Sequence, residues 1–108
     1  MTMTTNTQTN STGVSNHATG KIVTNADGDA AVTLTLSFTP RYFKLINHTD
    51  RIVDEWVDGM ASANSLHVVA AGTQTLETTN GIAVSGRSVT MTATTMAASK
   101  TFYWVAFG

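Results

Sequence analysis

The stretch Thr101-Phe-Tyr-Trp-Val-Ala-Phe-Gly108 decides the fold that we expect for this chain. A strand here would place alternate side chains on opposite faces, and both sets are apolar. One set is Phe102, Trp104 and Ala106, and the other is Tyr103, Val105 and Phe107. A strand that is apolar on both faces needs cover on both. We therefore expect that it is the central strand of a two-layer fold, or that a partner covers its second face.

Length and cysteine content limit the possible architectures. The chain has 108 residues, enough for one domain and too few for two. At this size roughly two-thirds of the surface of the extended chain can be buried. The absence of cysteine excludes disulfides, thiolate metal ligands and cysteine nucleophiles. Stability must therefore come from the packing of apolar side chains.

Charge is scarce along the whole chain. Only 12% of the residues are charged, and the formal net charge is -1. Nucleic acid is not expected as a partner, because phosphate binding needs a concentrated basic patch. No membrane partner is expected either, because no apolar stretch approaches the roughly 20 residues that cross a bilayer. A surface kept polar by threonine, serine and asparagine favours close neighbours, since no ions have to be desolvated at an interface.

Residues 1–20 differ in composition from the rest, since they contain no Asp, Glu or Arg and no Lys. Their few apolar side chains cannot offset the entropy of ordering them. We expect a flexible N-terminal arm over 1–20 and a β-sandwich domain over 21–108. A functional arm would become ordered on a neighbour by strand addition, which the β-branched threonines favour.

Short alternating segments fill the remaining sequence. The clearest is 31–39, in which Val32, Leu34 and Leu36 alternate with hydroxyl residues. The expected strands are 21–24, 31–39, 41–47, 51–57, 65–70, 73–79, 82–84, 87–92 and 101–108. Helical structure is limited to a possible single turn within 93–100. We predict an all-β fold, a single compact antiparallel β-sandwich, jelly roll or barrel of about eight short strands with an extended N-terminal arm.

Turn residues separate these strands. Asn25-Ala-Asp-Gly-Asp29 predicts a hairpin turn rather than a calcium loop, because the positions of the glycine and glutamate that an EF-hand needs hold Ala30 and Leu36. His48-Thr-Asp50 predicts a turn between the strands 41–47 and 51–57. Asn80-Gly81 predicts a hairpin that places 82–84 opposite 73–79.

The carboxylates, histidines and serines form no pattern typical of a catalytic or metal-binding site. The acidic cluster Asp50, Asp54, Glu55 and Asp58 predicts a solvated strand and turn near Arg51, since Asp54 and Glu55 point to opposite faces of a strand. Ser65 and His67 face the same way, but no nucleophile elbow surrounds Ser65. His67 is expected to point outward or to be hydrogen-bonded. His17, His48 and His67 have no ligand spacing. We expect no catalytic residue, no bound metal and no cofactor.

From Arg41 onward the chain resembles small virion proteins of tailed bacteriophages. The resemblance rests on Tyr42-Phe-Lys-Leu-Ile-Asn-His-Thr-Asp-Arg-Ile-Val-Asp-Glu-Trp56, on Val69-Ala-Ala-Gly-Thr-Gln-Thr-Leu-Glu-Thr-Thr-Asn-Gly-Ile82 and on Lys100-Thr-Phe-Tyr-Trp-Val-Ala106. It implies a noncatalytic structural protein that decorates and stabilises a phage capsid by bridging major capsid subunits. The implied location is the outer surface of the capsid, after assembly in the host cytoplasm. The motifs are strand motifs, so the resemblance implies a role and no site residues.

The expected partners are the major capsid protein and further copies of the chain, as a trimer in preference to a dimer. The expected interface residues lie in the arm and in the aromatic strand: Thr4, Thr5, Asn6, Thr7, Thr9, Asn10, Phe102, Trp104 and Phe107. The alternative is a receptor- or glycan-binding module of a phage head fibre or tail. That function needs an exposed aromatic platform, for which Tyr42, Trp56, Tyr103 and Trp104 are candidates if they are not packed in the core.

Overall fold

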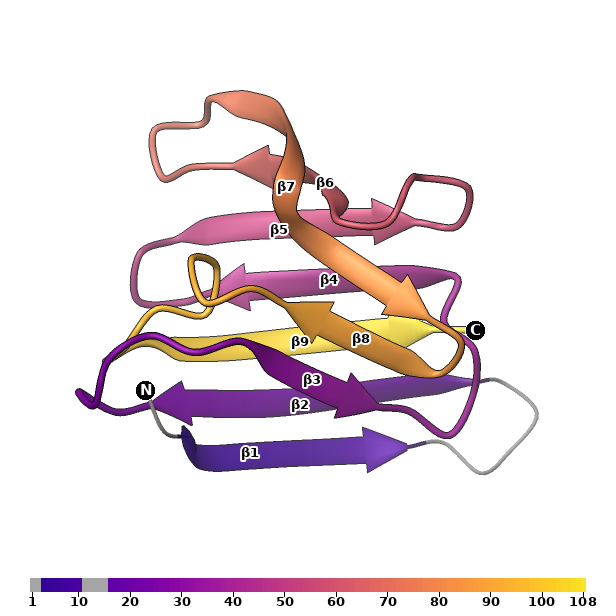
Figure 1. The fold of residues 1–108 in the computed structure, drawn as a ribbon, viewed down its shortest axis with the longest axis horizontal. Helices are drawn as coiled ribbons and strands as arrows, with labels where there is room; N and C mark the ends of the chain where they lie inside the picture. Colours follow the sequence, from indigo (N-terminus) through magenta and orange to yellow (C-terminus); the bar gives the residue numbers. More distant parts are fainter. Residues whose placement is uncertain (1–2, 11–15) are drawn as a thin grey trace.

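The computed structural model describes residues 3–10 and 16–108. Within them the fold is all-β, and the strands form one antiparallel sheet (Figure 1). The strands are β1 (Met3–Asn10), β2 (His17–Thr24), β3 (Val32–Thr35), β4 (Tyr42–Asn47), β5 (Ile52–Val57), β6 (Asn64–Val68), β7 (Gln74–Ser85), β8 (Ser88–Met91) and β9 (Thr101–Phe107). Their order across the sheet is β1-β2-β9-β4-β5-β6-β7-β8-β3.

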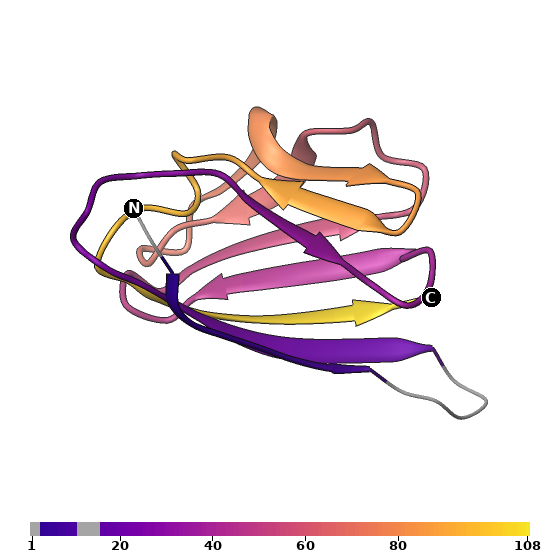
Figure 2. The same ribbon diagram turned by 60° about the horizontal axis from the view of Figure 1, so that its bottom comes forward.

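The sheet curls over itself into two layers. The first part of β7 pairs with β6, its second part pairs with β8, and β8 pairs with β3. Figure 2 shows β3, β8 and the end of β7 lying across the broad layer that contains β2, β9 and β4. The result is a half-barrel, which confirms the expected compact antiparallel β fold. We refer below to the broad layer (β1, β2, β9, β4, β5, β6) and the small layer (β3, β8 and the second part of β7).

The core lies between these two layers. The small layer contributes apolar side chains in strict alternation, and the broad layer faces them with larger ones. The fully buried members include Val89, Met91, Ile82, Met96, Ile22, Phe43, Leu45, Phe102 and Ala106. Because the chain has no cysteine, this packing is what holds the two layers together.

Strand β9 is an interior strand of the broad layer, between β2 and β4. Its inner row enters the core, where the Trp104 ring stacks on Phe43 with ring centroids 5.6 Å apart. Gly20 pairs with Trp104 across the ladder, and a Cβ at Gly20 would collide with the indole ring. The absence of a side chain at Gly20 therefore makes room for one of the two tryptophans of the core.

The sheet begins earlier in the chain than the sequence predicted. Strand β2 starts at His17 instead of Lys21, and β1 adds a further strand at its edge. The expected boundary at Lys21 falls inside β2, because residues 17–20 form ladder pairs with β9. Whether residues 1–20 act as an arm toward a neighbour stays a prediction.

Two turns differ from the expectation. Strands β2 and β3 lie in different layers, so residues 25–29 cross between the layers and do not close a hairpin. Residues Asn80 and Gly81 lie inside β7 as a bend, because the strand continues through them to pair with β8. A Cβ at Gly81 would lie 2.5 Å from the backbone carbon of Asn64, so the glycine permits the close approach of β6. By contrast, the hairpin of β4 and β5 forms as predicted.

Residues 92–96 form one helical turn, closed by a hydrogen bond from the Met96 amide to the Thr92 carbonyl, 2.9 Å long. Across the described ranges 3–10 and 16–108, no helix has the length and apolar character needed to cross a membrane.

Candidate interaction surface and cavity

The outer face of the broad layer carries apolar side chains that no other described element covers. Residues paired across a ladder share a face, so the pairing registers define which side chains lie there. We call this set the open face: Val23, Tyr103, Val105, Phe107, Tyr42, Ile46, Val53, Val57, Leu66, Val68 and Leu76, with Lys21, Lys44 and Glu55 among them. The small layer covers the opposite face only.

Solvent exposure separates the open face from a core. Leu76 is 61% exposed, Val57 49%, Phe107 48% and Tyr103 40%. A shallow hollow of about 410 Å³ lies beside Tyr103, over Ile46 and Val105, and its other side is formed by Thr7 of β1 and by Thr19 and Lys21 of β2. Single exposed apolar residues are normal on proteins, but a continuous set on one sheet marks an interaction site.

Two of the three charged side chains of the open face, Lys21 and Glu55, contact its aromatic residues. The ammonium group of Lys21 lies 5.7 Å from the centroid of the Tyr103 ring. The Tyr42 hydroxyl donates a hydrogen bond of 2.7 Å to Glu55. Burial and then this bond raise the pKa of Tyr42 to about 12, so the phenol stays protonated near neutral pH. The face therefore carries two lysines and one glutamate among its apolar residues.

For two of the aromatic residues predicted for an interface, Phe102 and Trp104, the prediction is wrong. They are 0% and 2% exposed and lie in the core. The alternation along β9 is as predicted, but the row that faces outward is that of Tyr103, Val105 and Phe107. Phe107 is thus the predicted aromatic residue that a partner could reach. Because Trp104 is buried and Trp56 is only 5% exposed, neither ring can form part of an exposed platform for stacking against a sugar.

The predicted interface residues of the N-terminal segment lie on the edge strand β1. Thr4 and Thr7 are exposed and form hydrogen bonds with β2. Thr4 Oγ1 donates to the Val23 carbonyl at 3.2 Å, and Thr7 Oγ1 accepts from the Lys21 amide at 3.1 Å. Thr5 is half-buried. The side chains of Asn6, Thr9 and Asn10 lie outside the described part. Among the described strands β1 pairs with β2 alone, so its other edge has backbone groups free for strand addition.

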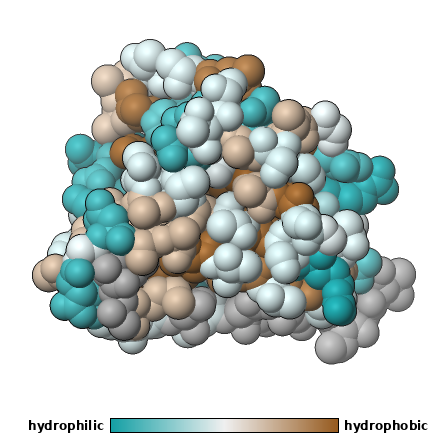
Figure 3. Space-filling model, viewed as in Figure 1, coloured by the Kyte–Doolittle hydropathy of each residue, from teal (hydrophilic) through white to brown (hydrophobic). Residues whose placement is uncertain are grey.

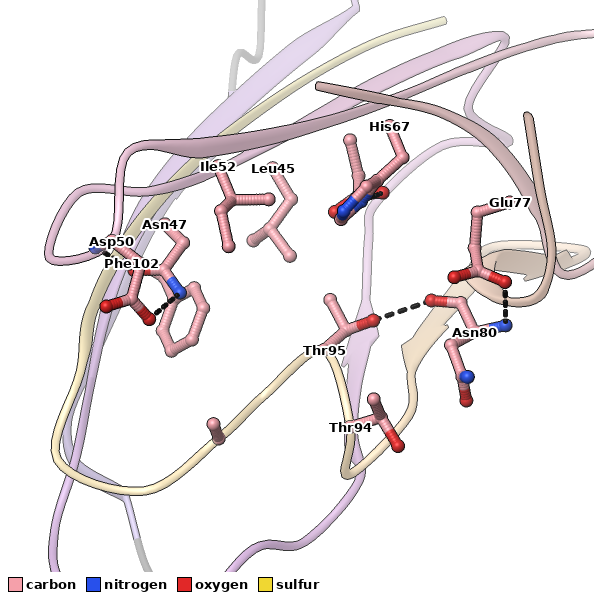
Figure 4. Close-up of a pocket in the computed structure, with 12 residues that line it drawn as sticks. Leu45, Asn47, Asp50, Ile52, His67, Glu77, Asn80, Thr94, Thr95 and Phe102 are labelled. Atoms are coloured by element: carbon pink, nitrogen blue, oxygen red, sulfur yellow. Dashed lines mark hydrogen bonds and ion pairs between the residues drawn. The ribbon is translucent and has the colours of Figure 1, made fainter. Parts of the chain in front are cut away.

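A second candidate site is a cavity of about 260 Å³ on the inner side of the broad layer. Figure 4 shows Asn47, Asp50 and Phe102 at one end and Glu77 with Asn80 at the other. Leu45 and Ile52 line its apolar part. The helical turn at residues 92–96 and the bend of β7 form the other walls of the cavity.

Asp54 organises the polar wall of the cavity. Its Oδ1 accepts a hydrogen bond of 2.8 Å from the Ser65 hydroxyl and lies 2.9 Å from His67 Nδ1. The Asp54 side chain is 4% exposed, so this carboxylate is buried rather than solvated as the sequence predicted. The prediction that Asp54 and Glu55 face opposite sides is confirmed. His67 takes the hydrogen-bonded alternative.

This arrangement is not that of a nucleophile and its base. In a catalytic triad the serine bonds to the histidine, and the histidine bonds to the acid. Here Ser65 and His67 both bond to the same oxygen of Asp54, so the histidine does not receive the serine proton. The geometry places Asp54 as a buried acceptor that joins β5 to β6.

The far wall of the cavity is held by Glu77. Its Oε2 accepts the amide protons of Thr78 and Thr79 at 3.1 Å and that of Asn80 at 3.2 Å. The bonds from Thr79 and Asn80 hold the pKa of Glu77 below its usual range. The Thr95 hydroxyl donates to the Asn80 carbonyl at 2.6 Å and ties the helical turn to the bend. No sequence pattern pointed to Glu77, Asn80 or Thr95 as residues of a site.

The remaining charged and histidine candidates are dispersed. Asp50 pairs with Lys100 at 3.1 Å, and Asp58 pairs with Arg41 at the surface at 3.5 Å. His48 meets the edge of the Tyr103 ring, and His17 lies near Phe107. In the part of the chain that the structure describes, no three His, Asp or Glu side chains are grouped for a metal ion.

The outward side of the small layer is chemically different from the open face. Its ladder partners are mainly hydroxyl residues, and the Thr33 and Thr90 hydroxyl oxygens lie 3.0 Å apart. Figure 3 shows this side, with hydrophilic groups gathered toward its rim and weakly polar or apolar groups at its centre. The two outer surfaces therefore offer a partner different contacts.

Comparison of the chain with protein-family models, with curated proteins and with solved structures found no match.

Proposed function

We propose that this chain is a noncatalytic structural protein that acts by assembling with other proteins. Its proposed assembly is the decoration and stabilisation of a phage capsid, on the outer surface of which it bridges major capsid subunits. The observation that carries the proposal is the open face, an apolar sheet surface uncovered by any described part of the chain. A protein surface of this kind binds another protein.

The choice of a capsid comes from the resemblance of three segments to small virion proteins of tailed bacteriophages. The geometry is compatible with that role, since the chain offers two kinds of contact. The open face supplies apolar area, and the free edge of β1 supplies backbone donors and acceptors for strand addition to a capsid subunit. Several weak contacts of each copy would combine into slow dissociation from the shell.

The proposal is tested by mixing the purified chain with undecorated heads of the phage that encodes it. We expect saturable co-sedimentation and heads that resist heating better than bare ones. A variant lacking residues 2–16 should keep a β-type circular dichroism spectrum and bind heads more weakly. Failure of the full chain to bind at saturating concentration would reject the capsid role, and equal occupancy by the truncated chain would reject the contribution of β1.

The cavity favours a second candidate, a receptor- or glycan-binding module of a head fibre or tail. Carboxylates, amides and hydroxyls around an apolar floor, as at Asp50, Asn80, Thr95 and Phe102, suit a small polyol. A glycan array, combined with the fluorescence of Trp56 on the same face as Asp54, tests this function. A silent array together with strong binding to heads would exclude it.

A further inference from the structure

We propose that the open face binds a second copy of this chain about a two-fold axis that runs along the boundary between β4 and β5. The inference deepens the proposed function, because it names the partner of the open face.

The side chains that β4 and β5 place on either side of that boundary are complementary to one another. Lys44 is the direct partner of Glu55, and Ile46 is the direct partner of Val53. A two-fold axis parallel to the strands and in the plane of the interface exchanges the positions of β4 and β5. It therefore places Lys44 of each copy over Glu55 of the other, and Ile46 of each copy over Val53 of the other.

The next strands on either side continue this match. Val105 of β9 lies in register with Lys44, and Leu66 of β6 lies in register with Glu55. The same axis exchanges β9 with β6, so Val105 of one copy meets Leu66 of the other. One row along, Tyr103 meets Val68 by the same operation. Facing sheets cross at about 30°, so the strands of each copy are tilted by about half that angle from the axis, which offsets the outermost rows and keeps the central ones in contact.

The charges of the open face suit a copy of itself better than a strongly charged partner. Lys44 and Glu55 attract one another across the axis, and Lys21 lies toward the rim over Tyr103. Nucleic acid or an anionic surface would need a basic cluster, and a strongly basic partner would need an acidic one. The face has neither.

The size of the face is adequate for a stable pair. The molecule measures 37 × 29 × 21 Å, and Figure 1 views the sheet along the shortest of these axes. The broad side of that envelope is about 1,100 Å², the product of 37 and 29 Å, while a stable interface buries about 800 Å² on each partner. The broad side of the molecule is therefore large enough for a contact of the required area.

A two-fold contact of this type closes at the dimer, whereas the sequence favoured a trimer. In the dimer the free edge of β1 and the hydroxyl-rich side of the small layer stay on the outside of both copies. These surfaces are then the ones available to capsid subunits.

Charge exchange at Lys44 and Glu55 tests the dimer. Lys44→Glu sets two carboxylates against each other at each contact, and Glu55→Lys sets two ammonium groups against each other. By sedimentation equilibrium we expect each variant alone to dimerise at least about tenfold more weakly than the unaltered chain. An equimolar mixture of the two should regain the affinity, because each pair of opposite charges is restored in the heterodimer. The double variant in one chain should also regain it.

Thr90→Glu, on the outer side of the small layer, is the matched control and should leave the dimer unchanged. An unaltered chain that stays monomeric at about 100 µM, or single variants that dimerise normally, would overturn the inference. Loss of rescue in the mixture would overturn the placement of the axis. A monomer that binds heads, and loses that binding on Ile46→Asp, would assign the open face to the capsid and leave the proposed function standing. A chain that dimerises as expected but does not bind heads would support the dimer and reject the proposed capsid function.

Discussion

Along β9, Phe102 and Trp104 are at most 2% exposed, whereas Tyr103 and Phe107 are 40% and 48% exposed. The two rows have similar hydrophobicity, and their environments differ because the small layer is large enough to cover one face of the broad layer only. Burial of these side chains is thus determined by what the remainder of the chain can place over them. The outer row is apolar although it does not enter the core, which is why we propose that it serves assembly.

Truncation of one residue in each row gives the largest expected contrast. Phe102→Ala should lower the free energy of unfolding by about 3–5 kcal/mol, because it removes a fully buried ring and leaves a cavity. Tyr103→Ala, measured on dilute protein by urea denaturation, should cost about 1 kcal/mol or less. Equal losses at the two positions would mean that the outer row is buried in the isolated chain, and the comparison would fail.

A buried polar group on the inner face gives the next largest effect. Ser65→Ala removes the 2.8 Å hydrogen bond to the buried Asp54 carboxylate, which should cost about 1–3 kcal/mol of stability. Ser37→Ala, at an exposed position, is the control and should change stability by about 0.5 kcal/mol or less. A Ser65 variant as stable as the control would show that Asp54 does not need this donor.

The smallest effect concerns Glu77, which holds the bend of β7 that leads from the broad layer to the small layer. The folded-state pKa of Glu77 lies below its ordinary value of 4.5, so its contribution to stability is present above that pH and is lost as the pH falls through the folded-state pKa. Glu77→Gln should therefore lower the melting temperature at pH 7 by less than about 5 °C. The difference from the unaltered chain should shrink in acid. A constant difference across the pH range would contradict the assigned role of the carboxylate.

Alternating segments made most of the fold predictable. The pattern of Val32 and Leu34 and the two apolar rows of β9 identified strands whose existence and inner-outer alternation the structure confirms. Strand β1 was missed, because it contributes no buried apolar residue and is held by a backbone ladder to β2. The bend at Asn80 was mistaken for a hairpin turn, since the capture of three successive amides by Glu77 has no local sequence signature.

The candidate sites were predictable only in part. Alternation shows that β9 has two apolar faces, but which one enters the core depends on the layer above it, and Phe102 and Trp104 were consequently assigned to an interface. Likewise Ser65 and His67 were expected to share a face. Their meeting with Asp54 required the register of β5 with β6, which no single segment contains.

The position of β9 also has a consequence for the order in which the molecule is made. The strand follows every other described strand in the sequence, yet it inserts between β2 and β4, which have no direct pairing. During synthesis, the edges of β2 and β4 that pair with β9 therefore have no partner strand until residues 101–107 leave the ribosome. We therefore expect the sheet to close only after this strand is synthesised, and a pause in translation before that point to leave the edges of β2 and β4 open to aggregation.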